Sequence, residues 1–260
     1  MSTTKDKGRV RLKDRRRKKM RLTAVLVALA VIVAAGGLVF LARLPSLQIT
    51  TITVSGASVL NADALKSATD EALQGWYAFV IPKRLSFIAP TKSIATALEA
   101  TFPEAGDIEI ALQSTQSIEV RVVERSPYAL YCDSACYVMD RGGYIYMSSG
   151  GEALRRYSGT VAEGPVGSRF LEGRFVELDT FLTALEEGTG SSITSARVTE
   201  ERDVIATFDG GGEIRFELRD MGTSLSESVK AVFASPKFRR EALDYADFRF
   251  GQKAVVKFNE

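Results

Sequence analysis

Two cysteines, Cys132 and Cys136 in the stretch "YCDSACY", are the residues best placed by spacing to do chemistry together. The three residues between them suit a turn that could bring the two α-carbons within bonding range. We expect a disulfide, with two free thiols as the alternative. Closing so small a loop would add about 2 kcal/mol of stability in the chain-entropy model. Two cysteines alone do not make a zinc site, and the chain has no histidine to complete one.

The lack of histidine also narrows the catalytic chemistry of the chain. Ser-His-Asp and Cys-His arrangements are excluded, as are histidine-based metal sites. Carboxylates are plentiful, with 32 Asp and Glu residues, but no pattern singles out an acid–base pair. The glycine runs at 142–143, 150–151 and 210–212 lack the following Lys-Ser/Thr of a phosphate loop and fit hairpin turns. We therefore expect a protein that is not an enzyme and that needs no cofactor or metal.

Charge and hydropathy divide the chain into parts that face different surroundings. Residues 1–21 hold 11 Lys or Arg and 2 Asp, whereas the remainder carries a net charge of −7. Residues 22–42 contain no charge, and as a helix they would span roughly 31 Å, close to the hydrocarbon thickness of a bilayer. We expect a single transmembrane helix over 22–43, with a signal peptide or a buried core helix as the alternatives.

The basic residues precede this segment, and only Arg43 follows it closely. The positive-inside rule then predicts a cytoplasmic tail at 1–21 and an extracytoplasmic remainder. A nucleic-acid contact is the other interpretation of such a basic run. Its position directly beside the apolar segment favours a role in orientation and in contact with anionic lipids, so we expect no nucleic-acid partner.

The first exported region, 46–125, is predicted to alternate in the order strand, helix, helix, strand, strand. Asn61 is a suitable N-cap and Pro103 a stop signal, and the aromatic stretch 76–90 is expected to be a loop. Two helices on one face of a three-stranded sheet can bury a small shared core. The predicted elements are a strand at 46–56, helices at 61–75 and 91–103, and strands at 107–114 and 117–125.

The second region, 126–260, is predicted to be a mixed α/β domain that ends in antiparallel strands. Pro127 marks its beginning, because proline does not continue a central strand. Two helices, at 176–188 and 224–236, interrupt the strands, and the glycine-containing stretch 147–176 has no clear pattern. The final strand, Ala254 to Phe258, offers an open row of backbone donors and acceptors if it lies at a sheet edge. A partner's extended segment could then add to it as a further strand, unless this strand is interior or covered.

Four stretches of the sequence resemble the FtsQ/DivIB family of cell-division proteins. A basic tail and one anchor precede "LQITTITVSGASVLNADAL", which is similar to the strand ending in V-x-G that opens the exported part of that family. "LEATFPEAGDIEIALQSTQSIEVRVVERSPYAL" is similar to the family's L-x-x-x-F-P and V-x-E-R-x-P-x-A run. "YVMDRGGYIY" and "LDYADFRFGQKAVVKF" resemble its D-x-x-G hairpin and its closing strands. The matches follow the family's order from the anchor to the last strand.

The resemblance implies a membrane-anchored α+β protein with a POTRA domain at 46–125 and a C-terminal β-domain at 126–260. It implies a single-pass protein of the plasma (inner) membrane, located at the division septum, that binds FtsB/FtsL-type partners and other division proteins without catalysis. FtsB would add a strand to the last strand of the β-domain. The corresponding residues are Ala254, Val255, Val256, Lys257 and Phe258, with Tyr245 and Arg249 as supports on the neighbouring strand. A POTRA-bearing export, secretion or chaperone-like membrane factor is the alternative.

Overall fold

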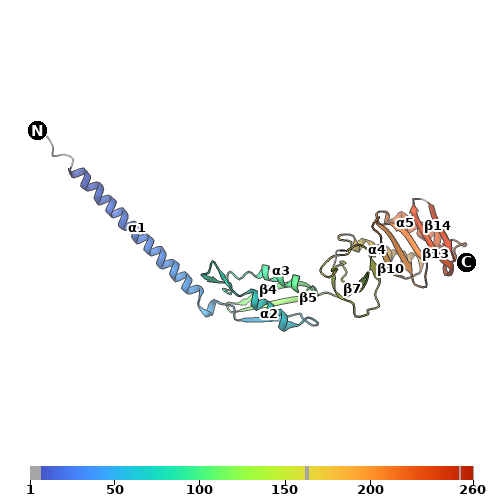
Figure 1. Ribbon diagram of the computed structural model, residues 1–260, viewed down its shortest axis with the longest axis horizontal. Coiled ribbons are helices and arrows are strands. Elements are labelled where there is room, and N and C mark those ends of the chain that lie inside the picture. Colours follow the sequence, from blue (N-terminus) through green and yellow to red (C-terminus); the bar gives the residue numbers. More distant parts are fainter. Residues whose placement is uncertain (1–6, 162–163, 252, 260) are drawn as a thin grey trace. The chain divides into compact units, whose positions relative to one another are not determined.

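The computed structural model describes residues 7–161, 164–251 and 253–259, and its contacts divide the chain into two compact units (Figure 1). One unit comprises Met1–Leu98 and Asp107–Val122, and the other comprises Glu99–Gly106 and Val123–Glu260. Both units combine helices with β-sheet, so the chain is an α+β protein.

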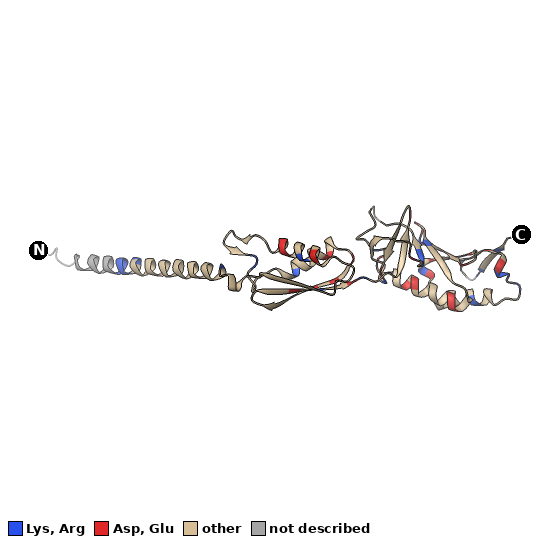
Figure 2. Cartoon of the chain, turned by 90° about the horizontal axis from the view of Figure 1, so that it is seen from below, with Lys and Arg blue, Asp and Glu red and all other residues tan. Residues whose placement is uncertain are grey.

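A long N-terminal helix, α1 (Lys7–Ala42), carries the apolar segment. Its Arg16–Ala42 portion is long and apolar enough to cross a membrane, and the described basic residues lie at its N-terminal end (Figure 2). The helix begins well before the apolar segment, so the predicted basic tail is helical from Lys7 onward; the first six residues of that tail lie outside the described residues. Helix α1 ends at Ala42, and Pro45, which lacks a backbone N–H, begins a short 3₁₀ turn, η1 (Pro45–Leu47).

A three-stranded sheet in the order β1-β5-β4 follows, with β1 parallel to β5. The strands of this sheet are β1 (Thr51–Ser55), β4 (Ala105–Ser114) and β5 (Ser117–Glu124). Two helices, α2 (Ala62–Ala72) and α3 (Thr91–Thr101), lie between β1 and β4 in the sequence. Ile118, Val120 and Val122 are buried on one face of β5, while Arg121 is exposed on the other. This alternation gives the sheet one apolar face. Helices α2 and α3 lie over one face of the sheet (Figure 2), and their own buried residues include Leu65, Ile94 and Leu98. The predicted order of these five elements is confirmed, with a short additional hairpin between the two helices. Strand β1 begins only at Thr51, because residues 45–47 form η1 and residues 48–49 pair with Arg84 and Leu85.

Local residue chemistry sets the boundaries of these elements. The Asn61 side chain caps α2 by accepting hydrogen bonds from the backbone N–H groups of Asp63 (2.9 Å) and Ala64 (3.1 Å). Gly56 ends β1 with a φ of +83°, and a Cβ atom there would lie 2.1 Å from the carbonyl oxygen of Val122. Only glycine combines this backbone conformation with so close an approach to the neighbouring strand.

The stretch 76–90, expected to be a loop, contains a short antiparallel hairpin of β2 (Trp76–Tyr77) and β3 (Ile81–Pro82). The turn between them holds Ala78 and Phe79 at positive φ values of 48° and 61°. Two consecutive positive φ angles are typical of the tight turn that matches strand twist, but they are costly for residues other than glycine. The hairpin was not predicted, because Pro82 and the many aromatic residues of this stretch are typical of a loop.

The second unit is built on a nine-stranded mixed sheet in the order β14-β13-β12-β11-β10-β9-β6-β7-β8. The β9–β10, β6–β9 and β12–β13 pairs are parallel, and the other neighbours are antiparallel. The strands are β6 (Ala129–Cys132), β7 (Cys136–Met139), β8 (Ile145–Ser148), β9 (Arg156–Ser158), β10 (Ile193–Val198), β11 (Asp203–Phe208), β12 (Glu213–Glu217), β13 (Leu243–Phe250) and β14 (Lys253–Phe258). Strand β9 was not predicted, and it lies in the stretch 147–176, of which residues 162–163 are outside the described residues.

Helices α4 (Phe175–Thr189) and α5 (Thr223–Phe233) pack against the apolar face of this sheet. The fully buried residues Phe208, Phe216, Tyr157 and Leu182 belong to one continuous core. Helix α4 also carries a buried carboxylate, Asp179. It connects α4 to the residues in and beside strand β9.

Asp179 accepts hydrogen bonds from three donors on the sheet side. The Arg155 guanidinium donates at 2.9 Å, the Tyr157 hydroxyl donates at 2.6 Å, and the Tyr128 hydroxyl donates as well. Arg155 also pairs with Glu186 of the same helix at 2.6 Å. Desolvation of the buried ring raises the pKa of Tyr157, so the hydroxyl stays protonated and remains a donor. The cluster therefore fixes α4 to β9 with every polar group partnered.

Candidate partner-binding edge

Strand β14 is the last strand in the sheet order, and it pairs on one side with β13. The register places Val256 opposite Ala246 and Val255 opposite Asp247. Within the part of the chain that the structure describes, no strand pairs with the other side of β14. The alternative that this strand is interior to the sheet is therefore excluded for the described residues, and β14 lies at the edge, as predicted (Figure 1).

Side chains of β14 alternate between the two faces of the sheet. Val256 and Phe258 pack against the core, where the Phe258 ring lies 5.8 Å from the ring of Phe238. Val255 and Lys257 are exposed, and residue Val255 retains 46% of its accessible surface. The strand is thus held to the domain by its inner face and by β13, while its free edge and outer face stay accessible.

The ring of Tyr245 on β13 contacts two cationic side chains on the outer face of the sheet, beside this edge. The Arg215 guanidinium lies 4.3 Å from the centre of the Tyr245 ring, and the Lys257 ammonium lies 5.8 Å from it. Lys257 also pairs with Asp244 at 2.7 Å, and this hydrogen bond raises the pKa of the lysine. Three neighbouring strands, β12, β13 and β14, therefore hold the Tyr245 ring in place.

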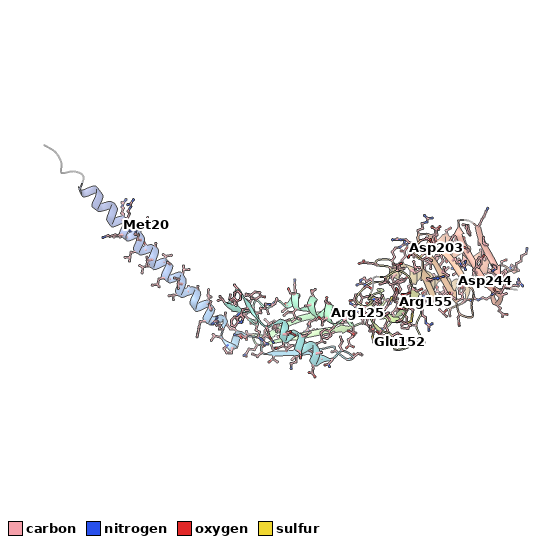
Figure 3. The ribbon with its side chains drawn as sticks, in the orientation of Figure 1. Met20, Arg125, Glu152, Arg155, Asp203 and Asp244 are labelled. Atoms are coloured by element: carbon pink, nitrogen blue, oxygen red, sulfur yellow. A yellow bond between two sulfur atoms is a disulfide. The ribbon has the colours of Figure 1, made fainter. Side chains whose placement is uncertain are left out.

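Arg249, the other predicted support, is fully engaged within the domain. Its guanidinium donates to both carboxylate oxygens of Asp247 and to Asp203 of β11 at 2.5 Å. Burial raises the pKa of Asp247, but hydrogen bonds from Arg249 outweigh burial and hold that pKa below its ordinary value. Arg249 thus stabilises the sheet behind the edge by joining β13 to β11. Asp203 and Asp244 both lie in the C-terminal part of this sheet (Figure 3).

At the opposite edge of the same sheet, strand β8 has backbone hydrogen bonds to a loop of the protein itself. The backbone N–H of Ile145 donates to the carbonyl of Ser168 at 2.9 Å, and the N–H of Gly167 donates to the carbonyl of Ile145 at 2.8 Å. An isolated bridge joins Tyr144 to Arg169. A loop of the protein itself therefore covers the start of β8, whereas no described segment covers β14 in this way.

The structure brings most of the predicted site residues together. Ala254 to Phe258 form one edge strand, and Tyr245 contacts Lys257 across the hairpin, but Arg249 lies farther along β13 and contacts carboxylates. Three further residues of this site, Arg215, Asp203 and Asp244, were not predicted from the sequence. Their only signal was the alternation of charged with apolar residues in their strands, which predicts an outer face but not a partner.

The two cysteines lie far from this edge in the sheet order. Cys132 and Cys136 form a disulfide that closes the β6–β7 hairpin, with their α-carbons 4.1 Å apart. Among the described residues, no group of three or more cysteine, aspartate or glutamate side chains is arranged to hold a metal ion.

Comparison with known proteins adds no family assignment. No family model matches the chain, and no curated protein matches it.

Proposed function

We propose that this chain is a bitopic cell-division protein of the FtsQ/DivIB type. Helix α1 would anchor it in the plasma membrane with its basic end in the cytoplasm, and the two units would lie on the other side. The β1–α2–α3–β4–β5 unit would be a POTRA domain, and the nine-stranded unit would be the β-domain. The four family-like stretches and their order along the chain support this proposal. The disulfide supports it too, because disulfides persist outside the cytoplasm.

One observation carries the functional part of the proposal, namely the uncovered edge of β14. An extended segment that pairs with this edge would gain backbone hydrogen bonds, and alternate side chains would contact Val255 and the Tyr245 stack on the outer face. The partner in this proposal is an FtsB-type protein in complex with an FtsL-type protein. Binding would recruit these partners to the septal peptidoglycan machinery without any chemical step by this chain.

The test is a titration of the full chain, in lipid nanodiscs, with the exported segments of the FtsB-type and FtsL-type proteins of the same organism. Hydrogen exchange is then followed at the amides of β14 with and without the partner. We expect saturable binding and slowed exchange on β14, because a paired edge amide is no longer open to water. Binding that leaves β14 exchange unchanged would refute the edge mechanism. Binding of unfolded polypeptides in place of division partners would favour the export or chaperone alternative.

A further inference from the structure

The β2–β3 hairpin and the segment after it carry a concentration of exposed apolar side chains that no part of the proposed function uses. We call residues 76–88 the aromatic hairpin. Phe79 at its turn is 95% exposed and Phe87 is 69% exposed. The exposed apolar residues of this segment are Trp76, Tyr77, Phe79, Val80, Phe87 and Ile88. An exposed apolar cluster of this kind is typical of a surface that contacts a membrane or another protein.

Backbone hydrogen bonds attach the aromatic hairpin to the chain just after α1. The N–H of Ile49 donates to the carbonyl of Arg84 at 2.8 Å, and the N–H of Ser86 donates to the carbonyl of Leu47 at 3.1 Å. An antiparallel bridge joins Gln48 to Leu85 between them. The hairpin is therefore fixed to the short segment that links the apolar helix to the first sheet.

Arg43 and Trp76 join the aromatic hairpin to the end of the helix. The Arg43 guanidinium lies 5.2 Å from the centre of the Trp76 ring, and Arg43 is the first residue after α1. The uncharged run 22–42 is about 31 Å long as a helix, which matches the hydrocarbon core. With this run spanning the core, Arg43 enters the headgroup layer, which brings the Trp76 ring that it contacts close to that layer.

We propose that the aromatic hairpin inserts into the headgroup–acyl boundary of the outer leaflet and orients the first sheet on the membrane. The inference rests on the membrane anchoring in the proposed function, but it does not depend on the partner-binding edge. Trp and Tyr prefer this boundary because their rings combine an apolar body with a polar tip. The Arg43 cation lies where lipid phosphates are, and the Phe79 side chain would enter the acyl region.

The conformation of the turn is consistent with this role. Ala78 and Phe79 both adopt positive φ, a strained state for these residues, and the Phe79 residue at this turn is exposed to solvent. Burial of that ring in lipid would offset the strain.

Trp76 is the only tryptophan of the chain, so its fluorescence reports on this site alone. The experiment compares the full chain in nanodiscs made with ordinary phospholipid and with phospholipid brominated near the glycerol end of the acyl chains. We expect strong quenching by the bromine atoms and weak quenching by aqueous acrylamide. A Phe79→Ser/Phe87→Ser variant should lose roughly half or more of the lipid quenching, because the two rings supply much of the inserted area.

A Val59→Ser/Val123→Ser variant is the matched control. Both valines are exposed: Val59 follows the end of β1, and Val123 is the second-last residue of β5. Because β1 and β5 are parallel, these are the strand ends opposite to the ones that adjoin the aromatic hairpin and η1. Lipid quenching of Trp76 should be unchanged in this control.

Integration of α1 is measured separately, by resistance of the chain in vesicles to alkaline extraction. An integrated chain whose Trp76 is open to acrylamide and unaffected by bromine would overturn the inference while leaving the anchoring intact. Protection from acrylamide without bromine quenching would overturn it too, in favour of contact with protein. A chain released by alkali would overturn the anchoring and the inference together.

Discussion

Proline substitution at Val255 and at Val256 tests the β14 edge most directly. In an antiparallel pair, successive residues of a strand direct their N–H groups alternately toward the neighbouring strand and away from it. Val255 and Val256 are consecutive and are both in register with β13, opposite Asp247 and Ala246. One of the two amides therefore serves the β13 ladder, and the other is free to donate to a partner.

One proline variant should therefore lose affinity for the partner, and the other should lose stability of the domain. Removing the partner-facing donor leaves one buried carbonyl of the partner unsatisfied, which costs about 1–3 kcal/mol. Since about 1.4 kcal/mol corresponds to a tenfold change in affinity, the dissociation constant should rise roughly 5- to 150-fold while the thermal stability of the free protein changes little. Removing the ladder donor should instead lower the stability of the domain by about 1–3 kcal/mol.

Isothermal titration of the full chain in nanodiscs with the exported FtsB-type segment measures the affinity, and calorimetry of the free chain measures the stability. Val255→Thr is the control, because it keeps the branched shape and the backbone N–H at an exposed position. Wild-type affinity in both proline variants, with the domain still folded, would show that the partner does not pair with β14.

Three further predictions concern stability, measured by urea unfolding. Asp247→Asn should destabilise the chain at neutral pH. Because the folded-state pKa of Asp247 is lowered, the difference from wild type should persist above the unfolded pKa of about 3.9 and disappear as the pH falls through the lower folded value; a constant difference would contradict this. Asp179→Ala should cost about 3–5 kcal/mol, because its buried donors lose their acceptor, whereas Glu187→Ala on the exposed side of α4 should change stability by less than about 0.5 kcal/mol. Cys132→Ser/Cys136→Ser should cost about 2 kcal/mol, and loss of partner binding in this variant would argue against a site confined to β14.

Elements whose residues repeat at a clear period were predictable from the sequence. Helix α2 begins after Asn61 as expected, because an N-cap signal and an amphipathic pattern coincide there. Strand β5 alternates over its whole length, so its buried face followed from the spacing of Ile118, Val120 and Val122. In both cases the local pattern and the tertiary environment agree.

Elements that depend on distant partners were not predictable. Strand β9 is three residues long, Arg156–Ser158, and it forms because its two parallel neighbours, β6 and β10, supply the hydrogen bonds. The same holds for the cluster around Asp179, whose donors come from residues up to 51 positions away. No local pattern encodes such pairings, because each residue alone fits a loop or an ordinary helix equally well.

The contrast between the two sheet edges is the strongest argument for a partner at β14. The same domain covers the start of β8 with the backbone of residues 167–169, so the fold has the means to protect an edge. At β14 the described chain uses only charge, with Lys253 exposed and Lys257 held by Asp244. Lysines discourage nonspecific pairing, but they leave the backbone groups between them accessible to a segment of complementary charge. An edge with this protection is suited to a selective partner, one whose residues next to its paired strand are acidic or polar.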